Sequence, residues 1–303
     1  MKSIEALFTS SFFDWYQVTF SEKMPVEWFI KCAQEQWDFL DIERASPRVK
    51  QYTHAANLKR GDRVIMHLCW GGHNIGLHVV STGSVSHDVG EWMQKHFSGL
   101  YGVSRADVRM DTTTEGVFDY LVKVAGDFAI DRKIKTNHQG DWLTGKAGRT
   151  LYLGSKDSVV QVRIYEKGKK EGGDPNWVRV EIQVRPSKAA KKSEAAHFKP
   201  HSFWQSSVWS FDLMNKLFIA DYSREVDVLG TVWRASDRER ALMALVSQYG
   251  NILDEIAGSL PSGWSDIGEY LKHFRDITKE NKKALSGSGE SPYEEVLSRI
   301  LAA

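Results

Sequence analysis

Apolar and polar residues alternate most regularly between positions 148 and 185, in short runs separated by clusters of Gly, Ser, Asp, Pro and Lys. The runs at 150–153, 159–165 and 177–184 have the period of two that is typical of β-strands, and the clusters between them are typical of turns. The pattern therefore predicts a meander of three antiparallel strands, with one apolar face turned toward a core.

The opposite face of this meander is predicted to be polar. It carries Gln161, Arg163, Tyr165 and Lys167 from the second run and Arg179, Glu181, Gln183 and Arg185 from the third. A tyrosine hydroxyl can act as a nucleophile, and cations beside it can hold a phosphate group. The sequence thus places together a set of side chains that could attack and hold a phosphodiester.

Outside the meander, mixed strands and helices give way to helices alone. Strands are predicted at 12–20, 52–56, 63–69, 74–81 and 104–112, and helices at 25–40, 85–97 and 116–128. A linker rich in Ala and Lys at 186–200 ends in a short helix, and helical spacing follows at 203–218, 237–256 and 264–283. We therefore expect an α+β fold with a mainly antiparallel sheet and packed helices. Its predicted parts are a sheet domain at 1–190, a helical C-terminal region at 200–285, and a linker with a short terminal helix at 286–303.

Charge is distributed unevenly along the 303 residues, whose formal net charge is only +1. An overall basic character is excluded, so contacts with nucleic acid would have to come from a local cluster. Between residues 163 and 199, ten basic residues stand against five acidic ones, although a solvated hairpin and linker can have the same composition. The candidate DNA-binding residues in this cluster are Lys169, Lys170, Arg179, Arg185, Lys191 and Lys192.

Other patterns exclude several classes of function. Cys32 and Cys69 are far apart, which gives neither a disulfide framework nor a metal finger and indicates a reducing environment. No stretch approaches the ~20 apolar residues of a membrane span, so we expect a cytoplasmic protein that does not contact membranes. The chain lacks a glycine-rich phosphate loop, which excludes ATP-driven helicase activity, and it lacks a His-hydrophobe-His motif.

Three segments of the meander, in this order, resemble the Rep-trans rolling-circle replication initiators of plasmids and filamentous phages: GRTLYLGSKDS, VRIYEKG and WVRVEIQVR. Upstream, SRADVRMD at 104–111 is similar to the R-x-D-x-x-x-D strand of that family, and DWYQVTF at 14–20 is similar to the strand that opens its domain. The resemblance covers roughly residues 100 to 190.

This resemblance implies that Tyr165 is the nucleophile that nicks DNA and that Glu181 binds a metal ion. Asp107 and Asp111 share one face of the strand at 104–112, where they are either solvated or line a cation site, and the resemblance favours the cation site. A site made of carboxylates suits Mg²⁺ or Mn²⁺ better than Zn²⁺.

Two further expectations concern the tyrosine itself. Arg163 and Lys167 flank Tyr165 and are expected to favour its phenolate or to bind the charge that develops on phosphorus. Tyr152 is the rival nucleophile, but we interpret it as a half-buried strand tyrosine in an apolar neighbourhood.

The function that the resemblance implies is nicking and rejoining of one DNA strand at a plasmid or phage origin, through a phosphotyrosine intermediate. Its expected partners in the bacterial host are origin DNA that is single-stranded or cruciform at the nick, a host helicase, and a second copy of the chain in a homodimer. Two alternatives stay open. One is a non-catalytic DNA-binding replication or regulatory protein, and the other is a conjugative relaxase with the same chemistry.

Overall fold

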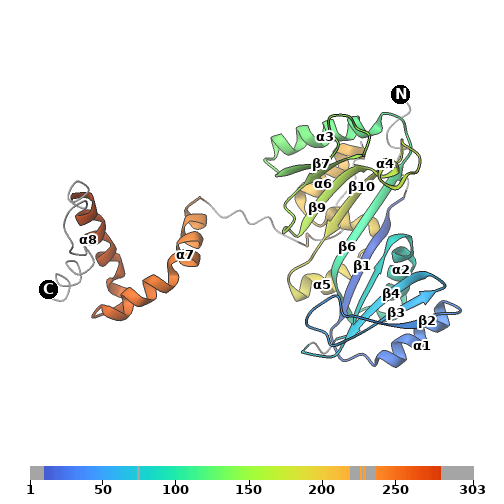
Figure 1. The fold of residues 1–303 in the computed structure, drawn as a ribbon, viewed down its shortest axis with the longest axis horizontal. Coiled ribbons are helices and arrows are strands. Elements are labelled where there is room, and N and C mark those ends of the chain that lie inside the picture. Colours follow the sequence, from blue (N-terminus) through green and yellow to red (C-terminus); the bar gives the residue numbers. More distant parts are fainter. Residues whose placement is uncertain (1–9, 74–75, 219–225, 227, 230–236, 281–303) are drawn as a thin grey trace. The chain divides into compact units, whose positions relative to one another are not determined.

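A computed structural model describes residues 10–73, 76–218, 226, 228–229 and 237–280 of the chain (Figure 1). The chain divides into two compact units, Met1–Val232 and Trp233–Ala303. The predicted boundary near residue 190 lies inside the first unit, which contains the whole sheet. The second unit contains α7 (Asp237–Ser259), the 3-10 helix η4 (Gly263–Asp266) and α8 (Ile267–Glu280). The predicted helix within 286–303 lies outside the described residues.

The first unit is built on one sheet of ten strands in the order β2-β3-β4-β5-β1-β6-β10-β9-β8-β7, and every neighbouring pair is antiparallel. The strands are β1 (Phe12–Phe20), β2 (Asp41–Ala45), β3 (His54–Arg60), β4 (Arg63–Trp70), β5 (His78–Thr82), β6 (Tyr101–Thr112), β7 (Thr136–Gly140), β8 (Arg149–Leu153), β9 (Val160–Glu166) and β10 (Val178–Val184). The sheet and its packed helices confirm the predicted α+β class.

Helices cover the apolar face of the sheet, where the main core lies. They are α1 (Val26–Gln36), the 3-10 helix η2 (Gly83–Val85), α2 (Ser86–Phe97), α3 (Val117–Asp131), the 3-10 helix η3 (Pro200–Gln205) and α6 (Val208–Phe218). Two short helices, α4 (Lys167–Glu171) and α5 (Ala189–Ala195), lie at strand ends. Val162, Ile164, Val180 and Ile182 are fully buried in this core, as their alternation predicts. None of the helices that the structure describes is long and apolar enough to cross a membrane.

Two strands were not predicted, and both are edges of the sheet. All five residues of β7 and four of the five in β2 are exposed, so neither strand has the apolar face that makes alternation visible in a sequence. Exposed edges that carry polar side chains also resist pairing with other chains. Their polar composition is therefore consistent with edge strands, but it does not distinguish them from loops.

The predicted helix at 203–218 is divided into η3 and α6 by a serine motif. The backbone N–H of Ser207 donates to Oγ of Ser210 at 3.2 Å, and the N–H of Ser210 donates to Oγ of Ser207 at 3.1 Å. This reciprocal capping satisfies N–H groups at the start of α6 that have no partner within the helix. A new helix therefore begins here, although the apolar spacing continues through the break.

Candidate active site on the polar face of the sheet

The pairing of β6, β10 and β9 arranges the predicted site residues in rows. Directly paired residues of antiparallel strands point to the same face of a sheet. On the face opposite the core, the rows are Tyr165–Arg179–Asp111, Arg163–Glu181–Arg109 and Gln161–Gln183–Asp107. The strand alternation predicted which residues share this face, and the pairing register now shows which of them are neighbours.

The centre of the site is the contact between Tyr165 and Glu181. The Tyr165 hydroxyl donates a hydrogen bond to Oε2 of Glu181 at 3.2 Å, and the guanidinium of Arg163 donates to Oε1 of the same carboxylate. Glu181 has no exposed surface. Burial raises the pKa of Glu181 to about 7, while Arg163 lowers this pKa and the nearby charge of Asp107 raises it. The carboxylate can therefore bind or release a proton near neutral pH.

The tyrosine is held as a phenol in this arrangement. Burial raises the pKa of Tyr165 far above its ordinary value, and the negative charge of Glu181 raises it further, although Arg179 and Arg163 act in the opposite direction. Arg163 therefore acts on the phenolate in the expected direction, but burial and Glu181 outweigh it, so the net shift favours the phenol. An attack by Tyr165 needs a base to take its proton, and the carboxylate of Glu181 already accepts the hydrogen bond.

The lysine beside Tyr165 is a different one from that predicted. Strand β9 ends at Glu166, so Lys167 begins α4 and its ammonium group pairs with Glu171. Nζ of Lys170 instead lies 5.3 Å from the ring centroid of Tyr165 and donates to Oγ1 of Thr150 at 2.5 Å. Alternation places Lys167 beside Tyr165 only if the strand continues, and the helical turn of α4 prevents this.

The three predicted metal ligands fall into two groups. Asp107 accepts hydrogen bonds from Arg105 at 2.6 and 2.8 Å and lies 3.6 Å from Arg163, which links it to Glu181. Asp111 lies in the neighbouring group, where Arg179 donates to it at 2.6 and 3.0 Å. Among the described residues, no three acidic, histidine or cysteine side chains are grouped so that they could hold a metal ion. The structure therefore brings Asp107 and Glu181 together and leaves Asp111 with arginines.

Asp14 is a site residue that was not predicted. From β1 it reaches the guanidinium groups of Arg109 at 3.2 Å and Arg179 at 3.0 Å. The feature of the sequence that could have identified Asp14 is its position in the DWYQVTF segment. Because β1 and β6 are neighbours at the centre of the sheet, that opening strand contributes its acidic residue to the same network (Figure 1).

Tyr152 lies closer to this network than its apolar sequence neighbours suggest. It pairs directly with Arg163 across β8 and β9, and it is half-buried. The predicted half-burial is confirmed, but its neighbourhood is polar, because the pairing register places Tyr152 on the same face as Tyr165. It therefore serves as a matched control for the proposed nucleophile.

The six candidate DNA-binding residues are dispersed over the first unit. Lys169 lies in α4 with Lys170, and its ammonium group contacts Oε1 of the buried Glu166 at 2.7 Å. Arg179 is 4% exposed and is held by Asp111 and Asp14, so its guanidinium is not free to contact DNA in this state. Arg185 donates to the carbonyl of Lys156 at 2.9 Å.

The remaining two lysines lie in α5. Lys191 pairs with Glu194 at 2.7 Å, and the Cβ atom of Lys192 packs against Gly102, near the start of β6. Asp111 is nine residues farther along that strand, a separation of about 30 Å at the rise of an extended chain. Of the four candidate lysines, Lys170 is therefore the one that lies beside Tyr165.

Comparison with known proteins finds a family match over the segment that contains this site. Residues 103–198, about a third of the chain, match the Rep_trans family model, described as replication initiation factor. This match confirms the resemblance for the segment that contains Tyr165, Glu181, Asp107 and Asp111. The solved structure of a rolling circle replication initiator protein from Geobacillus stearothermophilus is 22% identical, with a TM-score of 0.47 over 62% of this chain and 78% of that chain. No curated protein matches the chain significantly in sequence.

Proposed function

We propose that this protein nicks and rejoins one DNA strand at a replication origin, and that Tyr165 is the nucleophile that starts rolling-circle replication. The observation that carries this proposal is the hydrogen bond from the Tyr165 hydroxyl to the buried carboxylate of Glu181, within the segment that matches the replication initiation factors. A tyrosine placed against a carboxylate whose pKa is about 7 has a base for its proton at neutral pH.

In the proposed reaction, the phenolic oxygen of Tyr165 attacks the phosphorus of a phosphodiester while its proton passes to Glu181. The bond between phosphorus and the 3′ oxygen breaks, the 3′ oxygen takes a proton from water, and the 5′ phosphate stays on the tyrosine. The reverse steps rejoin the strand without ATP, because the phosphotyrosine ester conserves the energy of the broken bond.

Arg163 has a defined part in this reaction. Burial lowers the pKa of Arg163, but the neighbouring charges, chiefly that of Glu181, together keep it far above the ordinary value, so the guanidinium is permanently charged. It already contacts the carboxylate that receives the proton. When Glu181 becomes protonated, Arg163 loses part of its attraction to that group and can hold the negative charge on the phosphate.

We also propose a divalent ion, Mg²⁺ or Mn²⁺, at Asp107 and Glu181. Two adjacent carboxylates fit a hard cation, and an ion held there would lower the pKa of Glu181, which burial raises in this structure. Such an ion, when bound, polarises a non-bridging phosphate oxygen. Asp111 is a third candidate ligand, although Arg179 holds it. The resemblance alone supports a host helicase and a second copy of the chain as partners.

The direct test is nicking of supercoiled DNA that carries the origin. Tyr165→Phe should abolish the open-circle product and leave DNA binding within about twofold, because only the hydroxyl is lost. Tyr152→Phe is the matched control, since it makes the same change on the same face, and it should nick like the wild type. Nicking by the Tyr165→Phe protein would overturn the assignment.

The metal is tested separately in the same assay. Chelation by EDTA should silence the wild-type protein, and Asp107→Asn should need a higher Mn²⁺ concentration for the activity it retains. Nicking that continues undiminished in excess EDTA would remove the ion from the mechanism and leave the Tyr165 assignment intact.

A further inference from the structure

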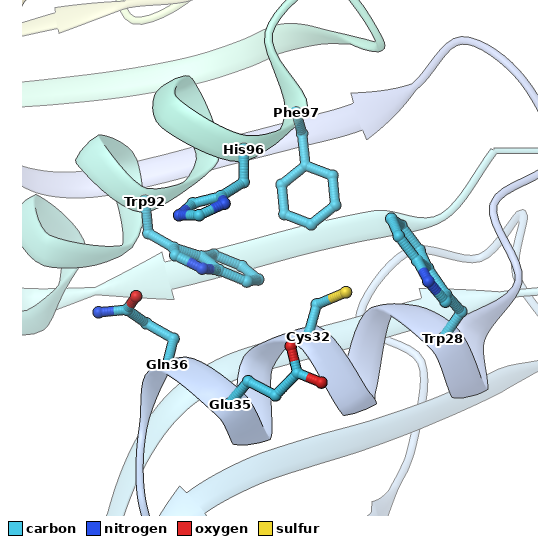
Figure 2. A pocket seen from close by; sticks show the side chains of 7 residues that line it. All are labelled: Trp28, Cys32, Glu35, Gln36, Trp92, His96 and Phe97. Atoms are coloured by element: carbon cyan, nitrogen blue, oxygen red, sulfur yellow. The ribbon is translucent and has the colours of Figure 1, made fainter.

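A second site opens between α1 and α2, which cover the apolar face of the sheet. It is a pocket of about 270 Å³ lined by Trp28, Cys32, Glu35, Gln36, Trp92, His96 and Phe97. Figure 2 shows Trp28 at one end, Trp92 and Gln36 at the other, and Cys32 and Glu35 between them. Because the candidate active site occupies the other face of the sheet, this pocket has no part in the proposed nicking reaction.

The aromatic walls of the pocket are fixed by packing. Trp92 is 5% exposed, and its ring lies 4.9 Å from Trp37 and 5.5 Å from Phe29 between centroids. Trp28 packs edge-to-face on Phe97 at 5.9 Å and is nevertheless 50% exposed. An indole that is held in place and half open to solvent can receive a ligand without losing much rotamer freedom.

The same pocket contains a carboxylate. Glu35 is exposed on α1, and its charge raises the pKa of the Cys32 thiol, second to the effect of burial. Within the part of the chain that the structure describes, no cation pairs with Glu35. The pocket therefore combines aromatic faces with an unpaired negative charge, and this combination attracts a cation.

The chain holds cations in such a set within its own fold, namely two arginines and Lys167, whose Nζ lies 5.7 Å from the ring centroid of Trp177 and pairs with Glu171. The guanidinium of Arg105 lies 4.1 Å from the ring centroid of Trp15 while it donates two hydrogen bonds to Asp107. The guanidinium of Arg179 likewise lies 5.7 Å from the ring of Trp177 and is held by Asp111. The pocket between α1 and α2 has the indole and the carboxylate of these sites without the arginine.

We propose that this pocket binds an arginine side chain of a partner protein. Its guanidinium would lie against an indole and pair with Glu35, as in the two internal sites. Exposed acidic residues outnumber exposed basic ones along α1 and just beyond its end, where Glu27, Glu35 and Asp38 stand against Lys31. This negative balance favours a protein over the phosphate backbone of a nucleic acid. The pocket is thus a docking point for a basic segment of a partner, on the face away from the proposed DNA site.

The probe for this proposal is N-acetyl-arginine amide, added to the full chain labelled with ¹⁵N. It should shift the indole N–H resonances of Trp28 and Trp92 in a saturable way, with millimolar affinity. N-acetyl-citrulline amide, which has the same shape without the charge, should bind at least about fivefold more weakly. Trp28→Ala and Glu35→Gln should each weaken arginine binding about fivefold, and the control Glu27→Gln on the same helix should not.

Three outcomes would overturn the proposal. The first is that the arginine probe leaves both resonances unmoved, and the second is that the citrulline probe binds equally well. The third is that an oligo(dT) strand shifts these two indole resonances and the arginine probe does not. The last outcome would make the pocket a base-stacking site. Retained dispersion of the other amide resonances shows that each variant is folded, and nicking by Trp28→Ala at the wild-type rate separates this proposal from the catalytic one.

Discussion

The two halves of the sheet carry buried polar clusters on the same face, but one cluster is charged and the other is neutral. In the half built by β6, β9 and β10, carboxylates face guanidinium groups around Tyr165. In the half built by β1, β4 and β5, the polar groups are His67, Cys69, His78 and Thr19. The pairing of Trp15 with Asp107, and of Thr19 with His78, places both clusters on one face.

The neutral cluster is made of hydrogen bonds within β4 and between neighbouring strands. Nδ1 of His67 lies 2.7 Å from Oδ1 of Asn57, Nε2 of His67 lies 3.3 Å from the Cys69 sulfur, and Nδ1 of His78 lies 2.8 Å from Oγ1 of Thr19. Burial lowers the pKa of His67, and it lowers the pKa of His78 to about 4. These groups are therefore uncharged at neutral pH.

The difference between the clusters indicates which half is suited to chemistry. Burying charge costs free energy even when it is paired, so an ion-pair network is weak support for stability alone. A neutral cluster can stabilise the sheet without that penalty. The groups of the charged cluster can exchange their partners for a phosphate or a cation. We infer that these buried charges are retained for this purpose despite their electrostatic cost.

The largest difference between the two clusters is expected in the nicking rate of the Glu181→Gln variant. The amide keeps the shape of the side chain but takes no proton from Tyr165, so the nicking rate should fall by about 10² or more. Cys69→Ala is the matched change in the neutral cluster, and it should leave the nicking rate of folded protein within about twofold. A single-turnover nicking assay checks both, and equal losses would show that the distinction between the clusters is wrong.

The second effect is a pH dependence of stability with opposite sign in the two clusters. The folded protein binds the Glu181 proton more tightly than the unfolded chain does, so this group's contribution to the free energy of unfolding decreases as pH rises from about 4.5 to about 7. The folded protein binds the His78 proton less tightly, so the contribution of His78 increases as pH rises from about 4 to 6.5. Each contribution is of the order of 1–3 kcal/mol.

Because the two contributions oppose each other in the wild type, the variants are needed to separate them. Chemical denaturation across this pH range should give Glu181→Gln a steeper rise of stability with pH than the wild type, and His78→Gln a flatter one. Slopes that change in the same direction for both variants would contradict the opposite pKa shifts of the two residues.

A smaller effect distinguishes the lysines of α4 from those of α5. Lys169 and Lys170 are bound to Glu166 and Thr150, so replacing both by Ala should destabilise the fold by about 1–3 kcal/mol. It should also weaken DNA binding and flatten the slope of log affinity against log salt by about 0.9 for each lost phosphate contact. Lys191→Ala with Lys192→Ala should change the melting temperature and that slope less. Equal salt slopes in the two double variants would remove α4 from the DNA surface.

The sequence predicts most of the central sheet because its strands have a buried face. The alternation in β9 and β10 identified Tyr165, Arg163 and Glu181 as residues of one face. Alternation contains no information about pairing register, so it could not show that Glu181 lies between Tyr165 and Arg163. The same alternation predicted that the strand continues to Lys167, although β9 ends at Glu166. The turn that forms α4 depends on the packing of Gly168 and Trp177 far more than on periodicity.

The most direct measurement of the nucleophile is mass spectrometry of the protein-DNA adduct after digestion with nuclease and trypsin. Trypsin releases Tyr165 in the peptide 164–167 and Tyr152 in the peptide 150–156, so the two candidates separate cleanly. We expect the residual nucleotide on the peptide 164–167, attached to Tyr165 through a phosphodiester. A nucleotide on the peptide 150–156, or on any other tyrosine, would contradict the proposed mechanism.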